Sequence, residues 1–157
     1  MINILRGYQE WTRSVVGKKL LSVNGVIYSL ENHDFSHPQQ LQFVFSEVED
    51  IESFKCGKDG STLELTDLPL QGSDLGEYGK ETVIDISHIY PIVNYIEKLL
   101  LKVFLISSSL EDAFVGVKLV FEGGLNLFIM NIGDEINMLE SLSSSYEQDE
   151  GIKYQQL

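Results

Sequence analysis

The sequence predicts an α+β fold, in which an antiparallel β-meander sheet packs against one or two helices. Three observations support it: an amphipathic segment opens the chain, alternating apolar and polar residues fill most of the rest, and Gly/Asp turns separate these stretches. The chain has 157 residues, of which 43% are hydrophobic, so it can bury a core of its own. We expect residues 1–139 to form a single α+β domain and residues 140–157 to form a polar C-terminal tail, as a loop or frayed end.

Two segments have helical periodicity. In the first, apolar residues recur three or four positions apart before a stop at Gly17; they are Ile4, Leu5, Tyr8, Trp11 and Val15. The second runs from about Ile89 to Leu101, where Pro91 suits the first turn and an apolar face follows. The sequence predicts a helix in each segment.

Alternation and turn residues predict the strands. Residues 19–30 indicate a hairpin that turns at Asn24-Gly25, and residues 41–46 alternate as LQFVFS. Residues 53–67 indicate a second hairpin, which turns at residues 57–60. A third, over residues 114–131, turns at Gly123-Gly124. Short strands are also expected at residues 82–87 and 102–107, and a long connection at 67–80.

Residues 41–65 and 117–139 share one rhythm of strands separated by Gly- and Asp-rich turns. One interpretation is an internal repeat, so that the sheet contains two similar units. The other is that any antiparallel meander produces this rhythm, because strand alternation and Gly/Asp turns are generic. The residues alone leave both interpretations open.

Charge is the strongest bias in the composition. The chain has 24 acidic and 11 basic residues, a net charge of −13. Such a surface repels phosphate backbones and anionic lipid headgroups, so direct binding to nucleic acid or to a membrane surface is not expected. This charge favours a protein partner with a basic surface. The alternative interpretation is that the acidic residues only keep the protein soluble.

The remaining general features predict a cytoplasmic protein. No apolar run approaches the roughly 20 residues that cross a bilayer. The first residues, MINILRGYQEWTRS, lack the basic head and apolar core of a signal peptide. The lone Cys56 cannot form an internal disulfide, which is typical of a reducing compartment.

The chain lacks the usual catalytic and cofactor motifs, so no cofactor is predicted and the protein is not expected to be an enzyme. His33 and His37 are four apart, as metal ligands on a helix can be, but Pro38 and the polar surroundings favour a loop. Cys56 and His88 could form a nucleophile and base, against a buried thiol in a strand.

Acidic residues give the predicted binding site. The densest group, in SEVEDIESF, lies between two predicted strands and is expected to be exposed; its members are Glu47, Glu49, Asp50 and Glu52. Asp134 and Glu135, in the turn that follows Gly133, form a second candidate patch. The structural interpretation of that turn is that Gly133 supplies a positive φ and Asp134 bonds nearby backbone N–H groups.

The same acids allow a cation site. Carboxylates are the ligands that hard cations prefer, and five of them recur near predicted turns: Asp59, Glu64, Asp67, Asp134 and Glu135. Their order lacks the spacing of a calcium loop, so a solvated acidic face is the alternative. No metal ligand is assigned.

A resemblance adds to these observations. The segments GVKLVFEGG and LFIMN, with the closing GDE, resemble small uncharacterised bacterial α+β proteins. Some proteins of that kind are encoded beside polymorphic toxins and act as immunity proteins. The resemblance covers mainly residues 100–138, and residues 41–66 more loosely, and it transfers no functional residue. It implies a fold that binds a toxin, such as a basic nuclease, and needs no catalytic machinery.

Three functions remain in view. The first is a non-catalytic cytoplasmic binding protein with an acidic interaction surface, of the immunity-protein kind. The alternative is a small metal- or ligand-binding enzyme whose site is assembled from dispersed residues such as Asp59, Asp134, His33 and His88. The third is an oligomerising module that uses an exposed strand edge. The sequence gives neither the partner nor the oligomeric state.

Overall fold

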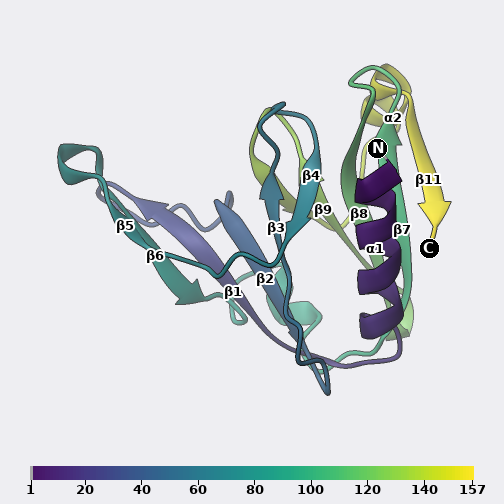
Figure 1. Ribbon diagram of the computed structural model, residues 1–157, viewed down its shortest axis with the longest axis horizontal. Helices are drawn as coiled ribbons and strands as arrows, with labels where there is room; N and C mark the ends of the chain where they lie inside the picture. Colours follow the sequence, from purple (N-terminus) through teal and green to yellow (C-terminus); the bar gives the residue numbers. More distant parts are fainter. Residues whose placement is uncertain (1) are drawn as a thin grey trace.

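The computed structural model describes residues 2–157 and contains two antiparallel sheets and two α-helices, which confirms the α+β prediction (Figure 1). The first sheet has six strands in the order β4-β3-β2-β1-β6-β5. Its strands are β1 (Leu20–Ser29), β2 (Gln40–Phe45), β3 (Ser53–Cys56), β4 (Leu63–Thr66), β5 (Ser73–Asp74) and β6 (Lys80–Asp85). A short 3-10 turn, η1 (Gly76–Tyr78), joins β5 to β6.

The second sheet has five strands in the order β10-β9-β8-β7-β11. Its strands are β7 (Leu100–Ser108), β8 (Ala113–Phe121), β9 (Leu125–Asn131), β10 (Ile136–Leu139) and β11 (Ile152–Gln156). The 3-10 turn η3 (Glu122–Gly124) links β8 to β9, at the glycine pair where the sequence predicts a hairpin. Each sheet therefore contains four consecutive strands paired in chain order, β1–β4 and β7–β10.

The two sheets are joined where β1 and β7 begin. The Leu20 N–H donates to the Lys98 carbonyl at 3.0 Å, and the Leu100 N–H donates to the Lys18 carbonyl at 3.0 Å. Lys19 and Leu99 form an antiparallel bridge between these bonds. Backbone hydrogen bonds thus link the two sheets where these strands begin.

The helix α1 (Ile2–Val15) closes one side of the main core and packs between β4 and β7. Its buried face is the predicted one, with Tyr8, Trp11 and Val15 almost fully covered. The Trp11 ring meets Phe54 of β3 edge-on, with 5.4 Å between centroids, and the Tyr8 hydroxyl donates to the Leu63 carbonyl at 2.6 Å. Each such buried side chain contributes about 1.5–3 kcal/mol to stability.

A second, smaller apolar cluster lies on the other face of the second sheet, and its members are Ile106, Ala113, Val115, Phe128 and Met130. It packs against side chains from residues 139–152, a segment that contains α2 (Ser144–Glu150). Ser143 caps α2 by accepting the Tyr146 N–H at 3.2 Å, and Gly151 ends it in the left-handed conformation.

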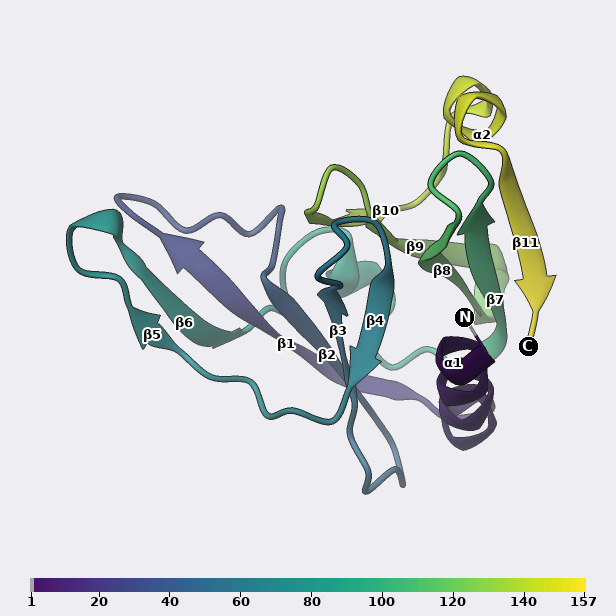
Figure 2. The same cartoon turned by 45° about the horizontal axis from the view of Figure 1, so that its top comes forward.

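The prediction that residues 140–157 are a loop or frayed end is therefore wrong, because this segment forms α2 and then β11, which pairs with β7 from Ile152 to Gln156 (Figure 2). Its polar composition is that of an edge strand, four of whose five residues are exposed.

The predicted hairpin at Asn24-Gly25 is also wrong, since β1 runs without a break from Leu20 to Ser29. Both edges of this central strand are paired, so that Asn24 lies opposite Gln42 of β2 on one side and Asp85 of β6 on the other. Gly25 is buried, and a β-carbon there would lie only 3.1 Å from Ile27 Cδ1. The glycine thus serves close packing rather than a turn.

The second predicted helix is replaced by the 3-10 turn η2 (Ile92–Asn94) and the start of β7. Ile92 and Tyr95 of its apolar face are buried, as a helix would require, but by a compact turn. Glu97 then takes a positive φ of 69°, and residues 97–100 pair with residues 17–20. Sheet pairing overrides the helical periodicity.

No helix in residues 2–157 is long and apolar enough to cross a membrane.

Candidate functional site

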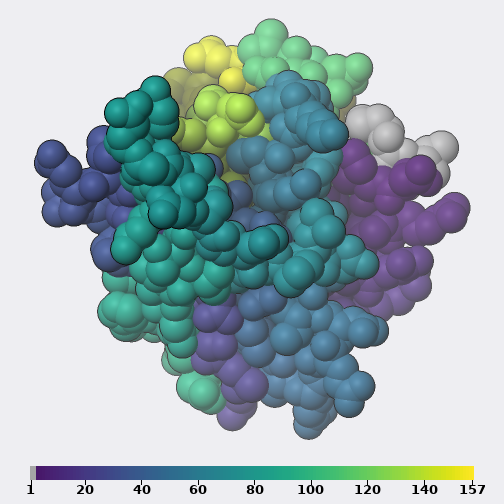
Figure 3. All heavy atoms as spheres, turned by 60° about the vertical axis from the view of Figure 1, so that its left-hand side comes forward, coloured from purple at the N-terminus to yellow at the C-terminus, as the bar shows by residue number. Residues whose placement is uncertain are grey.

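The predicted acidic residues fall into two groups at opposite ends of the molecule. The first group lies on the β2–β3 connection, the blue loop at the bottom of Figures 1 and 3. The second lies on the turn between β9 and β10, beside the β3–β4 turn at the top. A β-carbon on Gly60 would lie 3.8 Å from Asp134 Cγ, which confirms that these two turns touch.

Around the first group, four carboxylates from three parts of the chain gather, and we call them the acidic corner: Glu10, Asp50, Glu52 and Asp67. Glu52 is partly buried among them. Burial raises the pKa of Glu52, and the negative charges of Asp67, Glu10 and Asp50 raise it further. The fold thus holds like charges together at this place.

Sequence reasoning did not place Glu10 or Asp67 beside the acids of the β2–β3 connection, and it named Asp67 only among the carboxylates of a possible cation site. Glu10 comes from α1, so no local pattern could place it here. Asp67 follows β4, and the register of the β3–β4 hairpin pairs Ser53 with Thr66. Extending that register by one residue puts Glu52 opposite Asp67. The hairpin predicted from the sequence over residues 53–67 therefore already implied that these two carboxylates are neighbours.

Glu47 stands apart from the acidic corner because it is paired. Its Oε2 lies 3.0 Å from Lys18 Nζ, and its φ is 63°. Within residues 2–157 this is the one contact of 4.0 Å or less between a lysine or arginine and a carboxylate. An exposed pair of this kind contributes about 0–1 kcal/mol. No carboxylate of the acidic corner has such a counter-charge among the residues that the structure describes.

The β9–β10 turn confirms the structural interpretation of Gly133, whose φ is 64°. Asp134 follows with a φ of 62°, and Ile132 and Glu135 close the turn through reciprocal backbone bonds of 3.0 and 3.3 Å. The Asp134 carboxylate makes no hydrogen bond to the described part of the chain, contrary to the predicted bonding of its side chain to the turn. It is exposed and unengaged.

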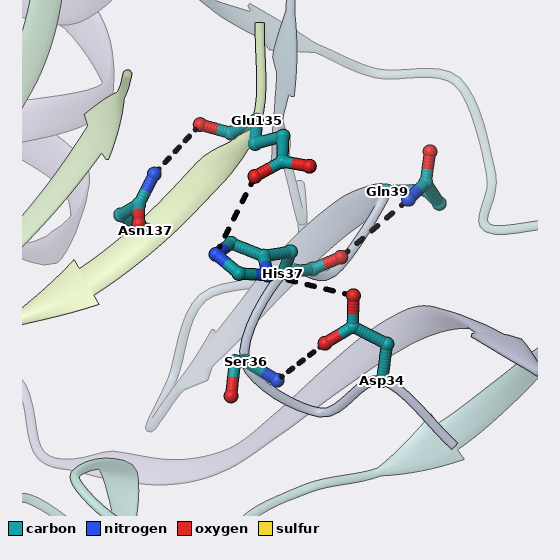
Figure 4. A network of polar contacts seen from close by, with 6 residues as sticks. All are labelled: Asp34, Ser36, His37, Gln39, Glu135 and Asn137. Carbon is teal, nitrogen blue, oxygen red and sulfur yellow. Dashed lines mark hydrogen bonds and ion pairs between the residues drawn. The ribbon is translucent and has the colours of Figure 1, made fainter. Parts of the chain in front are cut away.

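His37 lies between two carboxylates (Figure 4). Its Nδ1 is 3.4 Å from Asp34 Oδ2, and its Nε2 is 3.5 Å from Glu135 Oε2. These contacts connect the loop before β2 to the β9–β10 turn. They border a polar cleft of about 370 Å³ that is also lined by Lys55 and Cys56.

The chemistry of this cleft does not favour a nucleophilic cysteine. Burial first, and then the charges of Asp134, Glu135 and Asp59, raise the pKa of the Cys56 thiol to about 11, so the thiol stays protonated at neutral pH. His88, the predicted base, instead lies near Asp85, whose pKa is lowered mainly by hydrogen bonds from Ser87 and to a smaller extent by His88.

The residues of the alternative enzyme site are only partly brought together. Asp59 and Asp134 lie on adjacent turns, but His33 is exposed and packs against Phe35. The Asp59 carboxylate caps its own turn by accepting the Thr62 hydroxyl at 2.6 Å and two backbone N–H groups, which lowers its pKa. No group of three or more His, Cys, Asp and Glu in residues 2–157 could hold a metal ion.

No family model, no curated protein and no solved structure matches this chain. Its function has to be inferred from its own side chains. Two features of those side chains bear on the function: the crowded carboxylates of the acidic corner, and the acidic residues of the β3–β4 and β9–β10 turns.

Proposed function

We propose that this protein is a non-catalytic binding protein that presents the acidic corner to a basic protein partner. The observation that supports this most directly is the position of Glu52, partly buried among three other carboxylates, none of which pairs with a lysine or arginine of residues 2–157. Such crowding is unfavourable in the free protein. A partner that brings lysines or arginines to the corner relieves it, so the charges contribute more to the complex than to the fold.

The whole-molecule charge favours the same type of partner. A net charge of −13 attracts a basic surface over a distance and increases the association rate, most strongly at low ionic strength. Proteins that act on nucleic acids have basic active sites because they bind phosphates. The function we infer is therefore that of a cytoplasmic immunity protein, which blocks a basic toxin such as a nuclease by occupying its anion-binding surface.

The experiment is a comparison of two charge-reversal variants that have the same net charge. The first replaces Glu49, Asp50 and Glu52 by lysine. The control replaces the exposed Glu31, Asp74 and Glu77 by lysine, at the β5–β6 edge of the first sheet and away from the corner. The partner to try first is the product of the neighbouring reading frame, and association rates are measured by stopped flow at low salt after circular dichroism confirms folding.

We expect the corner variant to associate at least about tenfold more slowly than the control variant, because local charge complementarity adds to the overall field. Equal rates for the two variants would show that the corner is not the contact surface. In that case the acidic residues would contribute only through the net charge of the protein, which also keeps it soluble.

The polar cleft at His37 is the specific observation that favours a second candidate function, a small ligand-binding protein or enzyme. This cleft, of about 370 Å³, is lined by His37, Lys55 and Cys56 together with Glu135. Elemental analysis of the purified protein tests for a metal, and the Cys56→Ser and His37→Gln variants test any associated activity. A metal in stoichiometric amount, lost with the activity on chelation, would support this second function over the first.

A further inference from the structure

The outer edge of β11 is open to solvent along its whole length. β11 is the last strand of the second sheet, and Figures 1 and 2 both show no helix or strand beyond it. Four of its five residues are exposed, and it contains neither proline nor glycine. A strand at the edge of a sheet presents backbone N–H and C=O groups to which a further strand can bind.

The three other edge strands of residues 2–157 are protected. The helix α1 packs against β4, none of whose residues is exposed. The residues of β10 are all buried or half-buried. β5 has only two residues, and one of them is the charged Asp74. Covering elements, shortness and charge are the usual means of preventing edge-to-edge association, and of these β11 has only the charge of Lys153.

The hydrogen bonds at the two ends of β11 show which of its backbone groups face β7. The Gly151 carbonyl accepts an N–H from the residue that follows β7 at 3.1 Å, and the Leu157 N–H donates to a β7 carbonyl at 2.9 Å. Opposite residues of an antiparallel pair alternate between bonded and non-bonded positions. The register of β11 on β7 is regular, so Lys153 and Gln155 occupy bonded positions as well.

The intervening residues are Ile152, Tyr154 and Gln156, and their N–H and C=O groups therefore point away from β7. None of these groups bonds to another part of residues 2–157. A second extended backbone matches them, because its own donors and acceptors recur at the same two-residue spacing.

A second copy of β11 is complementary to this edge. If two copies pair in antiparallel register about Tyr154, Ile152 of one lies opposite Gln156 of the other, and every outward N–H and C=O group finds a partner. Lys153 then lies opposite the uncharged Gln155 of the other copy. Pairing about Lys153 instead would put two like charges opposite one another, which is destabilising.

We propose that two copies of this chain associate through β11, in antiparallel register about Tyr154, so that their second sheets join into one sheet. This contact is separate from the proposed function, since no carboxylate of the acidic corner lies on β11. Because each copy has a net charge of −13, long-range repulsion opposes the contact, and salt strengthens it by screening that repulsion.

Sedimentation velocity of the full chain tests the association. A single pair of strands buries less surface than a stable dimer needs, so we expect monomer at about 10 μM and dimer at about 1 mM. Raising sodium chloride from about 0.05 to about 0.5 M should lower the dissociation constant at least about threefold. A protein that stays monomeric at the higher protein and salt concentrations would overturn the proposal. A dimer that dissociates as salt is added would do the same, because it would rest on opposite charges elsewhere.

Amide hydrogen exchange, followed by NMR, identifies the strand. The amides of Lys153 and Gln155 bond to β7 and should be protected at every protein concentration. The amides of Ile152, Tyr154 and Gln156 should exchange rapidly in dilute protein and at least about fivefold more slowly in concentrated protein. Protection of these three amides that does not depend on concentration would contradict pairing between copies.

One variant removes an outward donor and leaves the bonds to β7 in place. Gln156→Pro eliminates an N–H that faces away from β7, so circular dichroism should show an unchanged fold. The dissociation constant of the dimer is expected to rise at least about tenfold, because proline also blocks approach of a second strand. A folded variant that dimerises as tightly as the wild type would place the contact elsewhere and refute the proposal.

A matched pair of variants tests the register without touching the backbone. Gln155→Lys and Gln155→Glu change the residue expected opposite Lys153 of the other copy. We expect the lysine variant to dimerise at least about threefold more weakly than wild type and the glutamate variant more tightly. Net charge alone predicts the reverse order, since the variants carry −12 and −14 in place of −13. That reverse order would rule out pairing about Tyr154.

Discussion

Glu52 has a charge that the fold makes unfavourable. Burial and the neighbouring Asp67, Glu10 and Asp50 raise its pKa above that of an unfolded glutamate. Ionised Glu52 therefore lowers the free energy of unfolding at neutral pH, and this loss disappears as the pH falls through the folded and then the unfolded pKa. We expect Glu52→Gln to raise the free energy of unfolding at pH 7 only slightly, by at most a few tenths of a kcal/mol, because water screens a partly exposed carboxylate. The gain should vanish at a pH well below the ordinary glutamate pKa, where Glu52 is protonated in both states, and urea denaturation measures it.

The control for this prediction is Glu31→Gln, which removes an exposed charge outside the acidic corner. It is expected to change the free energy of unfolding less than Glu52→Gln does, because water screens an exposed charge. The Glu52→Gln variant should also bind the partner more slowly. If Glu52→Gln is less stable than the wild type and binds the partner equally fast, the charge of Glu52 is neutralised by a counter-charge in solution.

At the scale of the element, strands could be predicted well and connections poorly. The alternation of residues 41–46 matches the burial of β2, where Leu41, Phe43 and Phe45 face the core. That signal is local, because a half-buried strand has a period of two. The helical periodicity around Ile92 was misleading, since the backbone of residues 97–100 pairs with a segment almost eighty residues earlier. No local pattern contains such a contact.

One part of the candidate site could be predicted from the sequence and another part could not. The sequence identifies the acids of the β2–β3 connection, because a charged run between two strands is visible in any reading. It does not show that Glu10 completes the corner or that His37 lies beside Glu135. These groupings join elements that are distant in sequence. They depend on how α1 and the two sheets meet.

Tyr95 gives a prediction for the segment that replaces the expected helix. Its side chain is 0% exposed. Its hydroxyl donates its one proton to two acceptors that share it, the Asn126 carbonyl at 2.5 Å and the Glu140 carboxylate at 2.8 Å, which connects η2 to β9 and to the segment after β10. We expect Tyr95→Phe to lower the free energy of unfolding by about 1–2 kcal/mol in urea denaturation, because the carbonyl of Asn126 loses its hydroxyl donor.

Tyr90→Phe is the matched control, because Tyr90 bonds to the same Glu140 carboxylate at 2.5 Å but is 69% exposed. It is expected to be less destabilising than Tyr95→Phe, since water replaces an exposed hydrogen bond. Equal effects of the two variants would mean that Glu140 alone, rather than burial of the Tyr95 hydroxyl, anchors this segment.

At the scale of the whole molecule, charge opposes folding and favours binding. The net charge is −13, and within residues 2–157 Lys18–Glu47 is the one lysine or arginine pair with a carboxylate. Like charges on a compact body repel one another, so the folded state is under electrostatic strain that an unfolded chain relieves. The joined sheets and their apolar core have to offset this repulsion. The same uncompensated field attracts a basic partner before contact.

Salt should therefore act on stability and on association in opposite directions. The screening length falls from about 30 Å at 0.01 M to about 3 Å at 1 M ionic strength, so added sodium chloride weakens both the self-repulsion and the attraction to the partner. We expect the melting temperature to rise by about 2–4 °C between these salt concentrations, equivalent to about 1 kcal/mol, while the association rate falls. Calorimetry and stopped flow measure the two effects.

The variant with lysine at positions 49, 50 and 52 has a net charge of −7 instead of −13, so its melting temperature should respond less to salt. An equal or larger response in that variant would show that the repulsion arises elsewhere than in the acidic corner.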